Sequence, residues 1–397
     1  MSGGDGWLCL VVAATQPLAP DLRDAMQPVA GDALPWDAAV TDAAPFDRVP
    51  GVGFNSNPVA AGIVPMPGRV RGSGPALVLD PAQNNTFRAL NEAWDAGATV
   101  RFADGMYRVS DLAASLRDRL VTDYALQAET GTGNGTLVGR PRLGMYRPWS
   151  PSMDEGWTRW LFEEYGYAFS NLRDADIHAG ELGERYDVIV LPSERPSLLA
   201  EGFATGSVPP RYEGGLGEEG VRAIDDFVRG GGTLLCLSAS SDWCIDALHL
   251  PVENVVGRLG REDFFSAGSI FEVRVDNTHP LMAGMPERGM IFFDRSPVFT
   301  TTDGFEGSVL AAYAEAGSPL LSGYLLGEEH LQGQAAALDV RHGEGHVVLF
   351  GFRPQWRGQP TGTFRTLFNG TLFHGPVAQG ALGAEGFWTP PGSKGGA

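Results

Sequence analysis

The sequence has few basic residues for its size. It holds 29 lysines and arginines against 48 aspartates and glutamates in 397 residues, a formal charge of 29 − 48 = −19. Such an excess of negative charge repels phosphate backbones and anionic lipid headgroups. Nucleic acids and membrane surfaces are therefore disfavoured as partners, whereas another protein chain or a homo-oligomer stays open.

Cysteines and long apolar runs are also scarce. Cys9, Cys236 and Cys244 form no disulfide framework, and they show neither a CxxC pair nor the spacing of a structural zinc site. The apolar run WLCLVVAA near the start is too short to cross a membrane and lacks the basic flank and cleavage site of a signal peptide. We therefore expect no membrane insertion and, for the chain as it stands, a cytoplasmic location.

The chain is long enough for two or more domains. Patterns typical of strands and helices are present, but they are distributed unevenly along it. Residues 1–72, rich in Ala, Pro, Gly and Asp, show no sustained period and are predicted to be irregular. Residues 73–128 read as a small α/β unit, and the Gly/Thr-rich residues 129–140 as a linker. Residues 376–397 are predicted to be a flexible tail.

Residues 141–375 alternate strands with helices. DVIVLP and TLLCL are continuous apolar runs, typical of strands buried on both faces of a parallel sheet, and GEEGVRAIDDFVR between them has helical spacing. Ser152 with Glu155 three residues later predicts a helix start. This order favours an α/β fold with a doubly wound, mostly parallel sheet, a β-rich section near 265–330 and ligands at the carboxyl ends of the strands.

The loop GFRPQWRGQP at 351–360 follows the expected strand HVVLF. It contains two arginines, two glutamines and a tryptophan, which are side chains that can hold a ligand or a partner surface. We expect it to lie beside the loop RPWSPSMDEG, so that ligand or interdomain contacts come from Arg353, Gln355, Trp356, Arg357, Arg147, Asp154 and Glu155. Two arginines can hold a carboxylate of a ligand or of another domain. The alternative is internal, with these arginines paired to Asp154, Glu155 or Glu194.

Several motifs occur in an order that resembles a known family. They are RLGMYRPWSPSMDEGWTRWLFEEYG, DVIVLPSERP, GGLGEEGVRAIDDFVRGGGTLLCLSASSDW and VVLFGFRPQWRGQPTGTFRTLFN. Together, over about residues 74–375, the chain is similar to the C-terminal region of large bacterial zinc carboxypeptidase (carboxypeptidase A-like) proteins. That region includes a class I glutamine amidotransferase-like domain. The resemblance implies an accessory role beside a peptidase domain, which is not recognised in this chain, and its members are often exported.

Amidotransferase chemistry needs a nucleophile on a strand-to-helix elbow and a histidine as base. In this sequence the elbow falls at Ser238, while Cys236 and Cys244 read as core thiols. Phe352-Arg353-Pro354 stands where the family carries its catalytic histidine, so the base is missing. A serine hydrolase through Ser238 or Ser240 stays open only if a histidine arrives from elsewhere, the candidates being His249, His342 and His346.

One set of residues fits the zinc pattern of the peptidase family. His178 and Glu181 form an H-x-x-E pair, and His279 follows about a hundred residues later. His178 falls in a connection inside the amidotransferase-like unit, so we favour a solvated loop and predict no cofactor. The sequence therefore predicts a non-catalytic module, a pseudoenzyme that packs on a peptidase domain or presents substrate to it. Residual zinc carboxypeptidase or serine hydrolase activity is the alternative.

Overall fold

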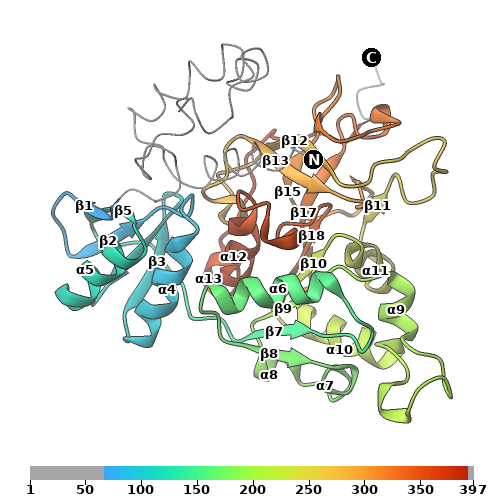
Figure 1. The fold of residues 1–397 in the computed structure, drawn as a ribbon, viewed down its shortest axis with the longest axis horizontal. Coiled ribbons are helices and arrows are strands. Elements are labelled where there is room, and N and C mark those ends of the chain that lie inside the picture. Colours follow the sequence, from blue (N-terminus) through green and yellow to red (C-terminus); the bar gives the residue numbers. More distant parts are fainter. Residues whose placement is uncertain (1–66, 392–397) are drawn as a thin grey trace, which may run out of the picture.

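The computed structural model describes residues 67–391, which form a mixed α/β fold with two sheets, each containing both parallel and antiparallel strand pairs (Figure 1). Most of the segment predicted to be irregular, residues 1–66, lies outside the described residues. Its last part was predicted wrongly, because Arg69–Arg71 form strand β1, which pairs in parallel with β5.

The N-terminal unit is a six-stranded sheet with the order β1-β5-β2-β4-β3-β6, and it carries two helices, α4 (Asn85–Asp95) and α5 (Ala114–Asp123). Its other strands are β2 (Ala76–Leu79), β3 (Thr99–Ala103), β4 (Met106–Ser110), β5 (Gln127–Gly131) and β6 (Thr136–Leu137). The linker expected at 129–140 is therefore wrong in part. Residues of this stretch end β5, which lies between β1 and β2, and form the short edge strand β6, so its glycines did not prevent strand pairing.

The larger sheet has twelve strands, and five of them form a parallel core in the order β8-β7-β9-β10-β18. Numbered along the chain, this order is 2-1-3-4-5, so it reverses between β7 and β9. The strands are β7 (Leu143–Tyr146), β8 (Phe169–Leu172), β9 (Val188–Leu191), β10 (Thr233–Leu237) and β18 (Gly345–Phe350). The predicted α/β class is confirmed, but the sheet is mixed where a mostly parallel one was expected, because its other strands pair antiparallel.

Antiparallel strands continue the same sheet beyond β18. The β17–β18 hairpin joins the two halves, and β15, β12 and β13 follow outward. The bounds are β11 (Val252–Asn254), β12 (Ser269–Val275), β13 (Arg288–Phe293), β14 (Phe299–Thr301), β15 (Gly307–Ala312), β16 (Leu320–Ser322) and β17 (Ala335–His342). The β-rich section is thus an extension of the parallel sheet and shares its hydrogen bonding.

Helices cover both faces of the parallel core. Alternate residues of β10 explain this, because Leu235 and Leu237 lie in one hydrophobic core while Leu234 and Cys236 lie in the other. The first core includes residues of α6 (Met153–Glu164) and α12 (Phe364–Leu372), and the second includes residues of α7 (Asp174–His178), α8 (Leu182–Arg185), α9 (Pro196–Glu201), α10 (Gly217–Arg229) and α11 (Ser240–Ala247). Among residues 67–391, no helix is long and apolar enough to span a bilayer.

Short 3₁₀ helices lie between the other elements at η2 (Pro210–Tyr212), η3 (Pro280–Met282), η4 (Glu328–His330) and η5 (Trp356–Gly358).

The N-terminal unit packs against α12, where the rings of Phe87 and Phe368 lie 4.9 Å apart and Tyr107 donates its hydroxyl to the Asn369 side chain at 2.9 Å. The two sheets therefore share one buried boundary.

The expected flexible tail is wrong for its described part, residues 376–391. Helix α13 (Gly375–Gln379) buries Val377 and Ala378, and Ala381 after it is buried too. Further on, the indole N–H of Trp388 donates to the Gly333 carbonyl at 2.7 Å. Glycine and proline disguise this segment, because it packs through scattered apolar residues without a repeating pattern.

The prediction of two core thiols was wrong, because Cys236 and Cys244 are joined in a disulfide. Cys236 lies in β10 and Cys244 in α11, eight residues apart. The bond closes the strand-to-helix connection that follows β10. A closed loop of this length stabilises a protein by about 2 to 3 kcal/mol in the chain-entropy model.

The disulfide gives a direct mass prediction, since both cysteines fall in the tryptic peptide 230–258. In protein purified and denatured without reductant, we expect this peptide to take up no iodoacetamide, because both sulfurs are bonded. After reduction it should carry an alkyl group on each cysteine, as liquid chromatography with mass spectrometry would detect. Full alkylation before reduction would show that the pair is not bonded.

Candidate functional site

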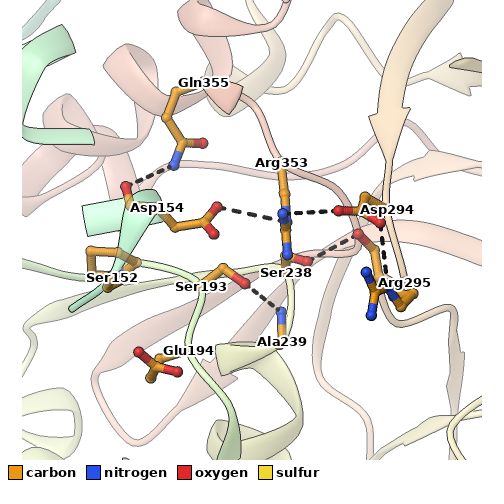
Figure 2. Close-up of polar contacts among 12 residues, drawn as sticks. Ser152, Asp154, Ser193, Glu194, Ser238, Ala239, Asp294, Arg295, Arg353 and Gln355 are labelled. Atoms are coloured by element: carbon orange, nitrogen blue, oxygen red, sulfur yellow. Dashed lines mark hydrogen bonds and ion pairs between the residues drawn. The ribbon is translucent and has the colours of Figure 1, made fainter. Parts of the chain in front are cut away.

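A cluster of polar side chains lies where the carboxyl ends of β9, β10 and β18 meet the first turn of α6 (Figure 2). In doubly wound sheets this edge is where ligands bind. Separate elements supply the cluster, which consists of Asp154 from α6, Ser193 after β9, Ser238 after β10, Asp294 and Ser296 after β13, and Arg353 and Gln355 after β18.

Ser238 has the backbone geometry of a nucleophile elbow. It is the first residue after β10, its φ is 48°, and α11 begins two residues later. A left-handed conformation is costly for a residue with a side chain, by roughly 1 kcal/mol or more. The side chain is buried, however, and its hydroxyl is hydrogen-bonded to that of Ser296 at 2.9 Å. The elbow is therefore formed, but its oxygen points into protein.

The backbone amide after the elbow is also occupied. In enzymes with such an elbow this amide helps to hold the oxyanion. Here the Ala239 N–H donates to the Ser193 hydroxyl at 3.3 Å (Figure 2). Ser240, the alternative nucleophile, donates its own hydroxyl to the Pro192 carbonyl at 2.6 Å and is buried. Neither serine is presented to a substrate.

Arg353 occupies the position expected for a catalytic base, and it lies between two carboxylates. Its Nη1 donates to Asp294 at 3.1 Å, and its Nε lies 3.6 Å from an oxygen of Asp154. The guanidinium also lies over the Trp356 ring, 4.5 Å from the ring centre. The side chain of Arg353 is 16% exposed, so the network is shielded from solvent. The internal pairing weighed from the sequence is thus present for Arg353.

Gln355, in the loop after β18, also belongs to this cluster (Figure 2). It is fully buried, and its amide nitrogen donates to the Thr158 hydroxyl at 2.8 Å in α6. Its Oε1, like Asp154 Oδ1 and Arg353 Nε, has no hydrogen-bond partner within the described part of the chain. Buried polar atoms without partners cost free energy, so the cluster keeps unused hydrogen-bonding capacity.

Burial changes the acidity of the cluster. The pKa of Asp154 is raised from 3.8 to about 6, mainly because burial disfavours the charged carboxylate. Arg353 opposes this rise in pKa, while the negative charges of Asp294 and Glu194 add to it. The carboxyl group of Asp154 therefore changes its protonation state close to neutral pH.

The other loop residues singled out from the sequence lie around this cluster. Trp356 is buried and stacks on Phe292 with ring centres 6.3 Å apart. Arg357 is exposed, has φ 54°, and makes no ion pair with any described residue, so the internal pairing weighed as the alternative is wrong for it. Arg147 and Glu155 face each other at 3.8 Å, on the side of α6 next to β7.

The residues of the zinc alternative are not brought together. His178 ends α7 and its Nε2 lies 2.8 Å from the Leu216 carbonyl, while Glu181 is exposed in a left-handed turn before α8. His279 is buried near Asp339 at 3.7 Å, and burial lowers its pKa. Within residues 67–391, no group of three His, Cys, Asp or Glu side chains is arranged to hold a metal ion. The zinc triad weighed as an alternative is therefore not assembled among these residues.

All seven histidines lie in the described chain, and none of them is hydrogen-bonded to Ser238 or Ser240. His342 contacts Asp225 at 2.6 Å and His346 contacts Asp339 at 2.8 Å, while His249 follows α11 on the surface. A histidine base for either serine is therefore missing from the site.

Three members of the cluster were missed by the sequence reasoning, namely Ser193, Asp294 and Ser296. Ser193 lies in the quoted motif DVIVLPSERP but carries no chemical signature there, and Asp294 and Ser296 come from the antiparallel section. The only local signal was their position directly after the apolar strands β9 and β13.

Comparisons with known proteins give weak similarities. No family profile matches the chain, and no curated protein matches it significantly. Among solved structures, a cytoplasmic protein from Salmonella typhimurium is 14% identical over 57% of this chain and 96% of its own, with a TM-score of 0.35. A ThuA-like protein from Bacteroides uniformis is 11% identical over 58% and 92%, with a TM-score of 0.33. A β-galactosidase from Bacillus circulans sp. alkalophilus is 12% identical over 62% and 32%, with a TM-score of 0.35.

The raised pKa of Asp154 predicts how stability changes with pH. Because the folded protein holds this proton more tightly than the unfolded chain, Asp154 favours folding at pH 4, and this contribution is lost as the pH rises through about 6. Relative to Asp154→Asn, which does not titrate, the unfolding free energy of the wild type should fall by up to about 3 kcal/mol between pH 4 and pH 7.

Urea unfolding of both proteins across this pH range measures the difference. Asp303→Asn serves as a matched control, because Asp303 lies in an exposed turn of the antiparallel section. A difference between wild type and Asp154→Asn that stays constant or grows with pH would contradict the assignment.

Proposed function

We propose that this chain is a non-catalytic accessory module of a zinc carboxypeptidase-like protein, built on a class I glutamine amidotransferase-like domain. Its parallel strand order, 2-1-3-4-5, is that of flavodoxin-like sheets, which supports the domain type. The ordered motifs over residues 74–375 resemble the region that accompanies the peptidase in that family. The module packs on a peptidase domain or presents substrate to it.

The observation that carries the proposal is the state of the elbow. Ser238 keeps the strained backbone of a nucleophile, yet its hydroxyl bonds Ser296 and the neighbouring Ala239 amide bonds Ser193. Arg353, held by Asp154 and Asp294, stands in place of the base. Nucleophile, oxyanion donor and base position are each engaged in internal contacts, which supports binding over catalysis.

An exposed apolar region supports a protein partner. Large apolar side chains that remain exposed include Met290 in β13, Leu321 in β16, and Tyr324 and Leu326 just after β16. Both β13 and β16 pair with β12, so these residues come from neighbouring segments at the outer end of the large sheet. We call this set the β12 edge surface. Exposed apolar groups gathered in one region are typical of interaction sites.

The serine hydrolase is the second candidate, favoured by the left-handed φ of Ser238 alone. If the module is non-catalytic, a fluorophosphonate probe should label wild type and Ser238→Ala equally weakly, as read by intact-protein mass spectrometry. This result follows because the hydroxyl is buried and lacks a base. Stoichiometric labelling that disappears in Ser238→Ala, with Ser322→Ala still labelled, would establish the hydrolase.

Partner binding is tested with a purified zinc carboxypeptidase domain from a protein of the resembling family. We expect a complex in sedimentation velocity, and Leu321→Glu should weaken it at least tenfold, because a charge would replace buried apolar contact at the β12 edge surface. Leu382→Glu is the matched control, since Leu382 is 80% exposed and follows α13 outside this surface. Absence of a complex at high micromolar concentration, or equal weakening by both variants, would contradict the accessory role.

A further inference from the structure

A second feature of the same sheet edge has no part in the elbow. A pocket of about 370 Å³ opens beside the carboxyl end of β7 and is lined by Arg147, Pro148, Trp149, Ser150, Pro151, Ser152, Met153, Glu155 and Arg173. The lining comes from the loop after β7 and from Arg173, which directly follows β8, so the pocket lies at the carboxyl edge of the parallel strands, where open α/β sheets bind ligands. We call this cavity the Arg147 pocket.

Its charge is opposite to that of the protein as a whole. Arg147 and Arg173 line the pocket, and Glu155 is the one carboxylate among the lining residues, in a chain with a formal charge of −19. Glu155 is already in contact with Arg159, one turn further along α6. The lining therefore keeps an excess of positive charge, which attracts an anion.

The two arginines have different roles. Arg173 forms part of the wall, because its Nη1 donates to the carbonyls of Arg147 and Pro148 at 2.7 Å each and its guanidinium lies 3.8 Å from the centre of the Trp149 ring. The side chain of Arg147 is 44% exposed, and its nearest described carboxylate, Glu155, is 3.8 Å away, beyond hydrogen-bonding distance. Arg147 therefore has donors free for a ligand.

Helix α6 adds to the attraction, because its N-terminus opens into the pocket at Ser152 and Met153. First-turn amides and the helix dipole favour an anion there. Of the acidic side chains in that turn, Asp154 contacts Arg353. Glu155 contacts Arg159 and lies 3.8 Å from Arg147 in the pocket wall, so its negative charge is shared between two arginines.

Apolar side chains form much of the remaining wall, beside Ser150 and Ser152. Pro148, Trp149, Pro151 and Met153 line the pocket, and the side chain of Met153 is 62% exposed. A bare inorganic ion would leave these surfaces in water. An anion that carries an apolar group would cover them, and the volume is within the range of sites for small molecules. Guanidinium groups also match the planar geometry of a carboxylate.

We propose that the Arg147 pocket binds an organic carboxylate, with the carboxylate on Arg147 at the N-terminus of α6 and the apolar group against Trp149 and Met153. A free carboxylic acid and the C-terminal residue of a peptide share this chemistry. The site goes beyond the accessory role, because it belongs to the chain alone and needs no peptidase domain.

The test is isothermal titration calorimetry on the full chain at low ionic strength. The ligands are N-acetyl-phenylalanine and, in a separate titration, N-acetyl-phenylalanine amide. We expect the acid to bind saturably and the amide at least tenfold more weakly, because only the acid carries the charge. Arg147→Gln should weaken binding of the acid at least tenfold. Arg222→Gln, on the exposed face of α10 outside the pocket, should leave it unchanged.

A tripeptide ending in phenylalanine separates the two sources of carboxylate, and both of its outcomes support the site. Binding as tight as that of the acid assigns the pocket to peptide C-termini, and much weaker binding assigns it to free acids. Equal binding of acid and amide, or an Arg147→Gln variant that binds like wild type, would overturn the proposal. So would inorganic phosphate that displaces the acid at equal concentration.

The outcome of the experiment with the peptidase domain and the outcome of the acid titration do not depend on each other. Acid binding that depends on Arg147, found in a chain that forms no complex with the peptidase domain, would count against the accessory role and leave the pocket assigned. The reverse pair of results would remove the pocket and keep the accessory role.

Discussion

The contact of Arg353 with two carboxylates links the parallel and antiparallel halves of the large sheet at the carboxyl ends of the parallel strands. Asp154 comes from the helix that follows the first parallel strand, and Asp294 from the end of an antiparallel strand. Removing one partner of a buried ion pair costs several kcal/mol, because the remaining charge stays without compensation. The guanidinium of Arg353 therefore links the loop after β18 to the first turn of α6 and to the end of β13, beside the Gln355–Thr158 hydrogen bond and the stacking of Trp356 on Phe292.

Hydrogen bonds at the same edge of the sheet maintain the elbow at Ser238. The left-handed backbone of Ser238 is strained, but its amide donates to the Phe350 carbonyl and its hydroxyl bonds Ser296. Those contacts offset a cost of about 1 to 2 kcal/mol. A conformation associated with catalysis in other folds is here an ordinary part of the packing between β10 and β18.

Much of the parallel half could be predicted from the sequence, because buried strands such as TLLCL and a capped helix at Ser152 leave strong local patterns. The position of Ser238 followed from the order of these elements, and Asp154 was one of three carboxylates weighed as a partner for Arg353. The linker and tail were predicted wrongly because glycine-rich strands and irregular packed segments lack a period. The pairing of Cys236 with Cys244, and the arrival of Asp294 beside Arg353, depend on distances in space that no spacing along the chain reveals.

The register of β10 with β18 has a consequence for synthesis of the chain. Thr233 pairs with His346, so 346 − 233 = 113 residues must be added before β10 gains its second neighbour. At roughly 5 to 20 residues per second, the apolar edge of a half-built sheet stays open for about 6 to 20 seconds on the ribosome. During that interval the nascent chain presents an unpaired strand of the kind that chaperones protect and that aggregates if it is left uncovered.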